Sequence, residues 1–240
     1  MQRAGSEATN IFLILANLVI QKGVFPDKWR KGLIYPIPKN ENWGYSLART
    51  RPIVLLETFR KNVVRIVQKR LSKVFIEHNI LKGLNYAGLP GLSTGAPIHI
   101  MNNILEEATQ KKKELWIGFQ DMKKAFDSVS LEALTCAMER IKIPEGAIRF
   151  VLNLYNKREI AVITKYGNTD SFVAEDGIDQ GEVISPLIWR IFYDPLLSKI
   201  QNKKFGFKVE VEWPIDIQRG TIQNREVQVG VLHMQMTPLG

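Results

Sequence analysis

Residues 119–129 read FQDMKKAFDSV, and residues 177–186 read GIDQGEVISP. The first stretch continues an apolar run, LWIGF at 115–119, which predicts a buried β-strand that ends at Asp121. The second joins a turn containing Gly177 and Gly181 to Ser185 and Pro186, residue types that cap and begin a helix. We therefore expect an aspartate at a strand end, and a turn whose glycines permit backbone conformations that other residues disfavour.

The rest of the chain alternates between the two hydrophobic periods. Helical periodicity or helix boundary signals occur in residues 11–21, 59–75, 96–112, 131–141, 145–157 and 187–200. Strand-like runs are residues 32–38, 159–165, 171–175, 205–211 and 226–232, and the prolines at 36 and 38 predict that the first of these is an edge strand. This mixture predicts an α+β fold, with helices packed on a small, mainly antiparallel sheet.

Composition sets wide bounds. The chain has 240 residues, 45% of them hydrophobic and 24% charged, which excludes a disordered or fibrous protein. The net charge of +9 favours polyanionic partners, although the same charge also serves solubility. The single cysteine, Cys136, excludes an internal disulfide, and we expect it to be a small core residue in a reducing, intracellular compartment. Residues 11–20 are apolar but short, which favours a buried helix over a membrane span.

Single residues have ordinary explanations. An aspartate such as Asp121 is more often a turn or cap residue than a metal ligand, and Phe126 alone is best explained as core. Lys39 and Arg51 are surface charges by default. The basic residues of the 59–75 helix fit a solvated face; they are Arg60, Lys61, Arg65, Lys69 and Lys73.

The combination is more specific. Asp121 followed by Ala125, Phe126 and Asp127, with the Gln180-Gly181 turn and its Ser-Pro helix start downstream, resembles two motifs of reverse transcriptases. Residues 35–39 (YPIPK) and 51–56 (RPIVLL) resemble the strands that carry a lysine and an arginine to the triphosphate in this family. The likeness extends from about residue 29 to 197 and is greatest to enzymes of non-LTR retrotransposons.

The resemblance implies a right-hand polymerase, with fingers and an N-terminal helical segment in residues 1–115 and a partial palm without a thumb in residues 116–240. It also implies an RNA template, a DNA primer and deoxynucleoside triphosphates as partners, Mg²⁺ as cofactor, and no membrane. Asp121 would be the catalytic carboxylate and would bind metal together with the backbone carbonyl of Met122. The implied nucleotide-binding residues are Lys39, Arg51, Phe126, Gln180 and Gly181.

One motif of that family is missing. A hairpin there carries Tyr or Phe, Ala, Asp and Asp, whereas the acids after residue 197 are Glu210, Glu212, Asp216 and Glu226, none adjacent to another. We therefore expect a fragment with negligible turnover. The alternatives are a non-catalytic remnant that binds RNA or primer–template, and a translated relic that does not fold stably.

A frameshift near residue 232 is a hypothesis for the missing motif. If the triplets are read one base earlier, the codons for residues 233–240 must encode the Ala and the second Asp of the missing motif. They can also encode the whole run Ala-Tyr-Ala-Asp-Asp. The hypothesis requires CAT for His233 and CAG for Gln235, so genomic DNA with CAC or CAA at these codons would exclude it.

Overall fold

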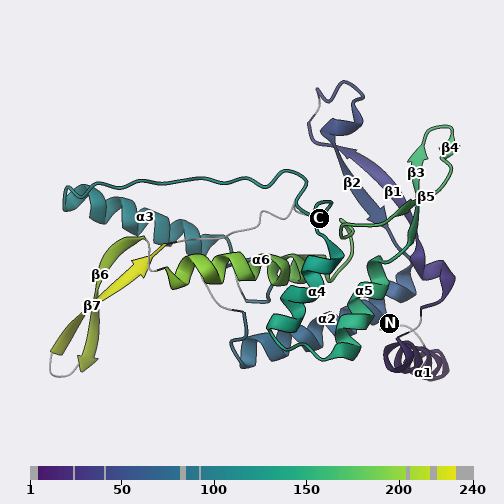
Figure 1. The fold of residues 1–240 in the computed structure, drawn as a ribbon, viewed down its shortest axis with the longest axis horizontal. Helices are drawn as coiled ribbons and strands as arrows, with labels where there is room; N and C mark the ends of the chain where they lie inside the picture. Colours follow the sequence, from purple (N-terminus) through teal and green to yellow (C-terminus); the bar gives the residue numbers. More distant parts are fainter. Residues whose placement is uncertain are drawn as a thin grey trace. The chain divides into compact units, whose positions relative to one another are not determined.

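In the computed structural model, the described residues are 5–23, 25–40, 42–81, 85–91, 93–203, 206–216 and 221–230. The chain divides into two compact units, the first made of residues 1–73 and 123–192 and the second of residues 74–122 and 193–240. Figure 1 gives the order of the elements. Residues 233–240, on which the frameshift hypothesis depends, lie outside the described residues.

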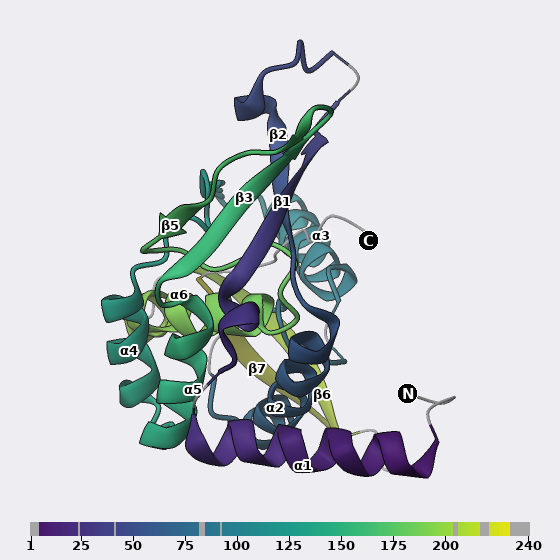
Figure 2. The same cartoon turned by 90° about the vertical axis from the view of Figure 1, so that its right-hand side faces the viewer.

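The first unit contains a five-stranded sheet. Strand β1 (Lys31–Pro38) pairs in antiparallel with β2 (Thr50–Leu55) and in parallel with β3 (Arg158–Thr164). Strand β3 also pairs in antiparallel with the short β4 (Gly167–Asn168) and β5 (Phe172–Ala174). Figure 2 shows β2, β1 and β3 side by side. The prediction of a mainly antiparallel sheet is confirmed.

The prediction that residues 32–38 form an edge strand is wrong, because β1 lies between β2 and β3. The register explains how a central strand tolerates proline. Only Lys31–Ile34 pair with β3, whereas Pro36 and Pro38 lie further along β1, where β2 is the only paired strand in the described sheet. A proline there leaves its nitrogen on the side without a partner strand.

Helices make up most of the rest of the first unit, and two of them continue into the second. They are α1 (Ser6–Lys22), α2 (Thr58–Glu77), α4 (Leu131–Arg140), α5 (Glu145–Tyr155) and α6 (Ser185–Asn202), with short 3₁₀ turns η1 (Asp27–Arg30) and η2 (Leu47–Arg49). Ser130 caps α4, as predicted, because its Oγ accepts a hydrogen bond from the Ala133 N–H at 3.3 Å. The fully buried apolar residues of this unit include Val63, Val64, Leu134, Met138, Leu187, Ile188 and Ile191.

The second unit contains α3 (Gly95–Gln110), the ends of α2 and α6, and a hairpin of β6 (Phe207–Asp216) and β7 (Thr221–Val229). The Lys113 ammonium lies 5.8 Å from the ring centroid of Phe207, which connects the hairpin to the segment after α3. This contact suits a cation and an aromatic face.

The predicted buried strand at 115–119 is absent. Residues 113–122 form neither helix nor strand, and Trp116 and Phe119 are each 87% exposed. A strand is stabilised by pairing with a neighbour, and none of the described strands pairs with this segment. An apolar run alone therefore did not suffice to form the strand.

Three further expectations are corrected. Cys136 is exposed on α4 rather than buried. Arg60 is 1% exposed, so it does not belong to a solvated face. Helix α1 is buried along only one side, since Phe12, Ala16 and Val19 are buried but Ile11 and Ile14 are more than half exposed. No helix among the described residues is long and apolar enough to cross a membrane.

Candidate functional site

The turn at residues 177–181 is hydrogen-bonded to the end of the 119–129 stretch. The N–H of Ile178 donates to the carbonyl of Phe126 at 2.9 Å, and the N–H of Gly177 donates to that of Val129, also at 2.9 Å. Gly177 has a φ of +83°, and a Cβ there would lie 3.1 Å from the Asp127 Cα. The two sequence motifs are therefore in direct backbone contact.

The same turn also contacts β2. The N–H of Val54 donates to the carbonyl of Gln180 at 2.7 Å. Gly181 has a φ of +124°, and a Cβ at this position would come within 2.6 Å of the Val54 carbonyl oxygen. Glycine is required at 181 for both reasons: its backbone conformation disfavours other residues, and the neighbouring strand leaves no room for a side chain.

Strand β2 carries Arg51, one of the predicted triphosphate contacts. Arg51 is half-buried and lies opposite Ile37 in the β1–β2 ladder. Lys39 follows β1 directly and is exposed, and its N–H donates to the Arg49 carbonyl at 3.0 Å. The two predicted cations thus lie at the same end of one two-stranded ladder.

The side chains of Phe126 and Gln180, the two other residues predicted to contact the nucleotide through a side chain, are only partly buried. Phe126 is half-buried, with its ring centroid 6.2 Å from that of Trp189. Gln180 is also half-buried. The first unit therefore contains all five predicted nucleotide-binding residues, three of them at the turn and its contact with the 119–129 stretch.

Asp121 and Met122, the predicted metal-binding residues, belong to the second unit. Both are exposed, and both lie in the segment that forms no strand. Nearby, the Tyr193 hydroxyl donates to Gln120 Oε1 at 3.4 Å. Within the described ranges, no group of three or more His, Cys, Asp or Glu side chains is placed to hold a metal ion. The described residues thus do not fit a complete metal site.

The sequence prediction missed a cluster of four buried charges around the Gln180 turn, here called the charge cluster. Its members are at most 4% exposed; they are Arg60, Arg158, Asp179 and Glu182. Arg60 Nε donates to Glu182 Oε2 at 2.9 Å, and its Nη2 lies 3.6 Å from Asp179 Oδ2, an ion pair longer than a hydrogen bond. Arg158 Nη1 donates to Asp179 Oδ1. The two positive charges balance the two negative ones.

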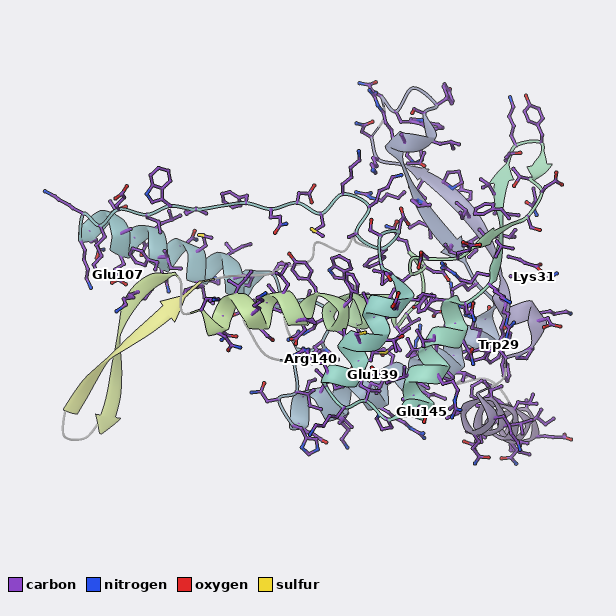
Figure 3. All side chains as sticks on the ribbon, viewed as in Figure 1. Trp29, Lys31, Glu107, Glu139, Arg140 and Glu145 are labelled. Carbon is purple, nitrogen blue, oxygen red and sulfur yellow. The ribbon has the colours of Figure 1, made fainter. Side chains whose placement is uncertain are left out.

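The guanidinium groups also bind backbone carbonyls on several elements. Arg60 donates to Trp29, which lies near Lys31 at the start of β1 (Figure 3), and to Leu154 of α5 at 3.3 Å. Arg158 donates to the carbonyls of Asp176 at 2.7 Å and of Gly177 at 3.1 Å. Arginine suits this position because its fixed fork of donors reaches several acceptors at once.

Hydroxyl groups extend the charge cluster into α5 and α6. Ser185 Oγ donates to the Asp179 carbonyl at 2.8 Å and lies 3.1 Å from the Tyr155 hydroxyl.

Burial raises the pKa of Asp179 and of Glu182, while the neighbouring guanidinium groups lower it. Burial also raises the pKa of Tyr155, so its hydroxyl stays neutral. The acids beside Gln180 are therefore occupied by internal partners.

One signal for the charge cluster was present in the sequence. Arg60 precedes the fully buried Val63 and Val64 by three and four residues, which places it on the buried side of α2. The partners of Arg60 gave no such signal, because Asp179 and Glu182 are 119 and 122 positions further along the chain.

The chain is similar to known proteins over most of its length. The family described as reverse transcriptase (RNA-dependent DNA polymerase) matches residues 37–216. The chain is 25% identical over 179 residues to "Probable RNA-directed DNA polymerase from transposon BS" of Drosophila melanogaster, covering 75% of this chain and 20% of that protein. It is 26% identical over 200 residues to "Retrovirus-related Pol polyprotein from type-1 retrotransposable element R2" of Nasonia vitripennis, covering 82% of this chain and 19% of that protein.

Among solved structures, "Structure of apo telomerase from Candida Tropicalis truncated from C-terminal domain" aligns with a TM-score of 0.48 and 16% identity, over 85% of this chain and 47% of that one. The chain spans about a fifth of the length of the curated relatives that it matches. Reverse transcriptases bind template, primer and nucleotides and generally use divalent metal ions. The family match covers three quarters of the chain and both motif stretches, and the chain therefore belongs to the reverse transcriptase family.

Proposed function

We propose that this chain is the nucleotide- and template-holding part of an RNA-directed DNA polymerase from a retrotransposon-like element, without turnover of its own. The main support is the hydrogen bond from Val54 to the Gln180 carbonyl, because it holds the glycine turn against the strand that carries Arg51. The proposed contacts with the incoming deoxynucleotide are made by Lys39, Arg51, Phe126, Gln180 and Gly181. A guanidinium and an ammonium suit a triphosphate.

The proposed lack of turnover rests on the absence of the family's adjacent aspartate pair from this sequence. Asp121 is the only acid of the predicted metal set that the chain contains, and no two acids after residue 197 are adjacent. Binding of Mg²⁺ by Asp121 and the Met122 carbonyl remains a prediction, and we assign no catalytic step to it. The division into fingers (1–115) and partial palm (116–240) also remains a prediction. It is based on the roles of these regions in the family, whereas the two structural units are defined by their compactness.

Primer extension tests the absence of turnover. The purified chain, an RNA template with a DNA primer, deoxynucleotides and Mg²⁺ should give no extended product. Clear incorporation of deoxynucleotides would contradict the proposal.

Binding tests the proposed contacts. Fluorescence anisotropy of a labelled RNA–DNA primer–template should show binding that weakens steeply with salt, because contacts to phosphates release counterions. A deoxynucleoside triphosphate complementary to the template should strengthen this binding, and Arg51→Ala should abolish that strengthening. Arg149→Ala is the matched control, since it removes one exposed positive charge from α5 in the same unit. Equal effects of the two variants would mean that only net charge matters.

A further inference from the structure

Helix α1 has a second apolar side that the described structure leaves open. Phe12, Ala16 and Val19 are buried, with the Phe12 ring 4.7 Å from that of Phe59. Away from this contact, Ile11, Ile14, Leu15 and Leu18 are 54%, 67%, 43% and 50% exposed. Figure 2 shows α1 along the outer side of the unit, below α2 and α5.

These four exposed residues, here called the α1 stripe, form one continuous surface. Their spacing is i, i+3, i+4 and i+7, which places them on one side of a helix. Single exposed leucines are ordinary in soluble proteins, but a contiguous row of large aliphatic side chains marks an interaction site. The spacing is also that of a helix that packs lengthwise against another helix.

The charges at the ends of α1 indicate the partner. Glu7 lies in the first turn and Lys22 in the last. Each is four residues beyond an end of the α1 stripe, so both fall on the same side of the helix. In the part of the chain that the structure describes, neither forms an ion pair. The midpoint between Glu7 and Lys22 and the midpoint of the α1 stripe coincide, between Ile14 and Leu15.

This arrangement is self-complementary. If two α1 helices pack in antiparallel about that midpoint, Ile11 faces Leu18 of the other copy and Ile14 faces Leu15. Glu7 then faces Lys22 at both ends, whereas a parallel arrangement would place like charges together. An isologous two-fold contact requires this kind of symmetry in one surface patch. Exposed ion pairs contribute little free energy, so the charges select the orientation and the aliphatic residues supply the affinity.

We propose that α1 is a self-association surface, through which two copies of this chain pair in antiparallel. One helix side is small compared with the interfaces of permanent dimers, so the association is weak and depends on concentration. It does not require nucleotide binding or polymerase ancestry.

Analytical ultracentrifugation of the full chain, from low to high micromolar concentration, tests the pairing. The weight-average mass should rise toward that of a dimer, and Ile14→Glu should keep it at that of a monomer. Leu13→Glu is the matched control, because Leu13 is 47% exposed on the same helix but lies off the α1 stripe. A wild-type chain that stays monomeric, or a dimer that Ile14→Glu leaves intact, would overturn the proposal, and the α1 stripe would then belong to another partner.

The orientation has its own test. Glu7→Lys and Lys22→Glu should each weaken the dimer, and the chain that carries both changes should regain wild-type association. With Cys136→Ser as background, a mixture of Glu7→Cys and Lys22→Cys chains should form a disulfide across the dimer, while Glu7→Cys alone should not. Crosslinking of Glu7→Cys with itself would indicate parallel helices and overturn the antiparallel arrangement. Circular dichroism confirms that each variant folds.

Discussion

The Gln180 turn and the Asp121 segment come from the two best motifs in the sequence, yet their surroundings differ greatly. The turn is held by backbone bonds to Phe126 and Val54 and is surrounded by the charge cluster. Residues 113–122 have neither helix nor strand, and their aromatic side chains are exposed. The contrast teaches that a motif is positioned by its neighbours, because the turn has partners on several elements whereas none of the described strands pairs with the Asp121 segment.

Arg60→Met should show the largest effect on this contrast. It leaves Asp179 and Glu182 buried with one guanidinium between them, and breaking a buried ion pair costs about 3–5 kcal/mol. Urea denaturation measures the loss in the free energy of unfolding. The control is Arg65→Met on the exposed side of α2, which should change it by less than about 0.5 kcal/mol. Equal losses would mean that the charge cluster does not stabilise the turn.

Gly181→Ala should cost somewhat less, about 2–4 kcal/mol, from backbone strain at a φ of +124° and from the clash with the Val54 carbonyl. Gly146→Ala is the control, because a Cβ in that part of α5 meets no atom within 4 Å. It should raise stability by about 0.5–1 kcal/mol through helix propensity. Thermal unfolding of both variants distinguishes these results, and a neutral Gly181→Ala would show that the turn and β2 separate easily.

The pH dependence of stability should show a smaller effect. Burial raises the pKa of Glu182 in the folded chain above its ordinary value of 4.5, so the folded state binds this proton more tightly than the unfolded state. The stabilisation is fully present below the unfolded pKa and is lost as pH rises through the folded one. Glu182→Gln removes it. From pH 4.5 upward, the free energy of unfolding of the wild type should therefore fall more steeply than that of the variant.

The opposite result has a definite meaning. If the wild type gains stability relative to Glu182→Gln as pH rises, the guanidinium groups outweigh burial, and the carboxylate is favoured in the folded chain.

Phe119→Ala should have the smallest effect. At 87% exposed, this ring contributes little packing, so the free energy of unfolding should change by less than about 0.5 kcal/mol. A buried strand phenylalanine would cost about 3–5 kcal/mol on the same change. A loss of that size in urea denaturation would mean that residues 115–119 are buried after all, which would remove the contrast between the two motifs.

The local pattern of this chain was readable without its structure. Hydrophobic period and turn residues predicted the cap at Ser130 and the helix that begins at Glu145. They also predicted the two strands β3 and β5, which pair in antiparallel. These signals lie within a few residues of the elements that they predict. The family motifs were readable for the same reason, since each is a short contiguous stretch.

Apart from the expected strand at 115–119, the sequence by itself determined the order of the predicted helices and strands, the glycine turn and the family, because these depend on neighbours along the chain. Only the tertiary structure decided that β1 is central, that Arg60 and Arg158 meet Asp179, and that residues 115–119 have no strand partner among the described residues. The pairing of β1 with β3 and the ion pair of Arg60 with Asp179 each join residues more than one hundred positions apart. Burial depends on which surfaces come together, and hydrophobic period alone does not specify that.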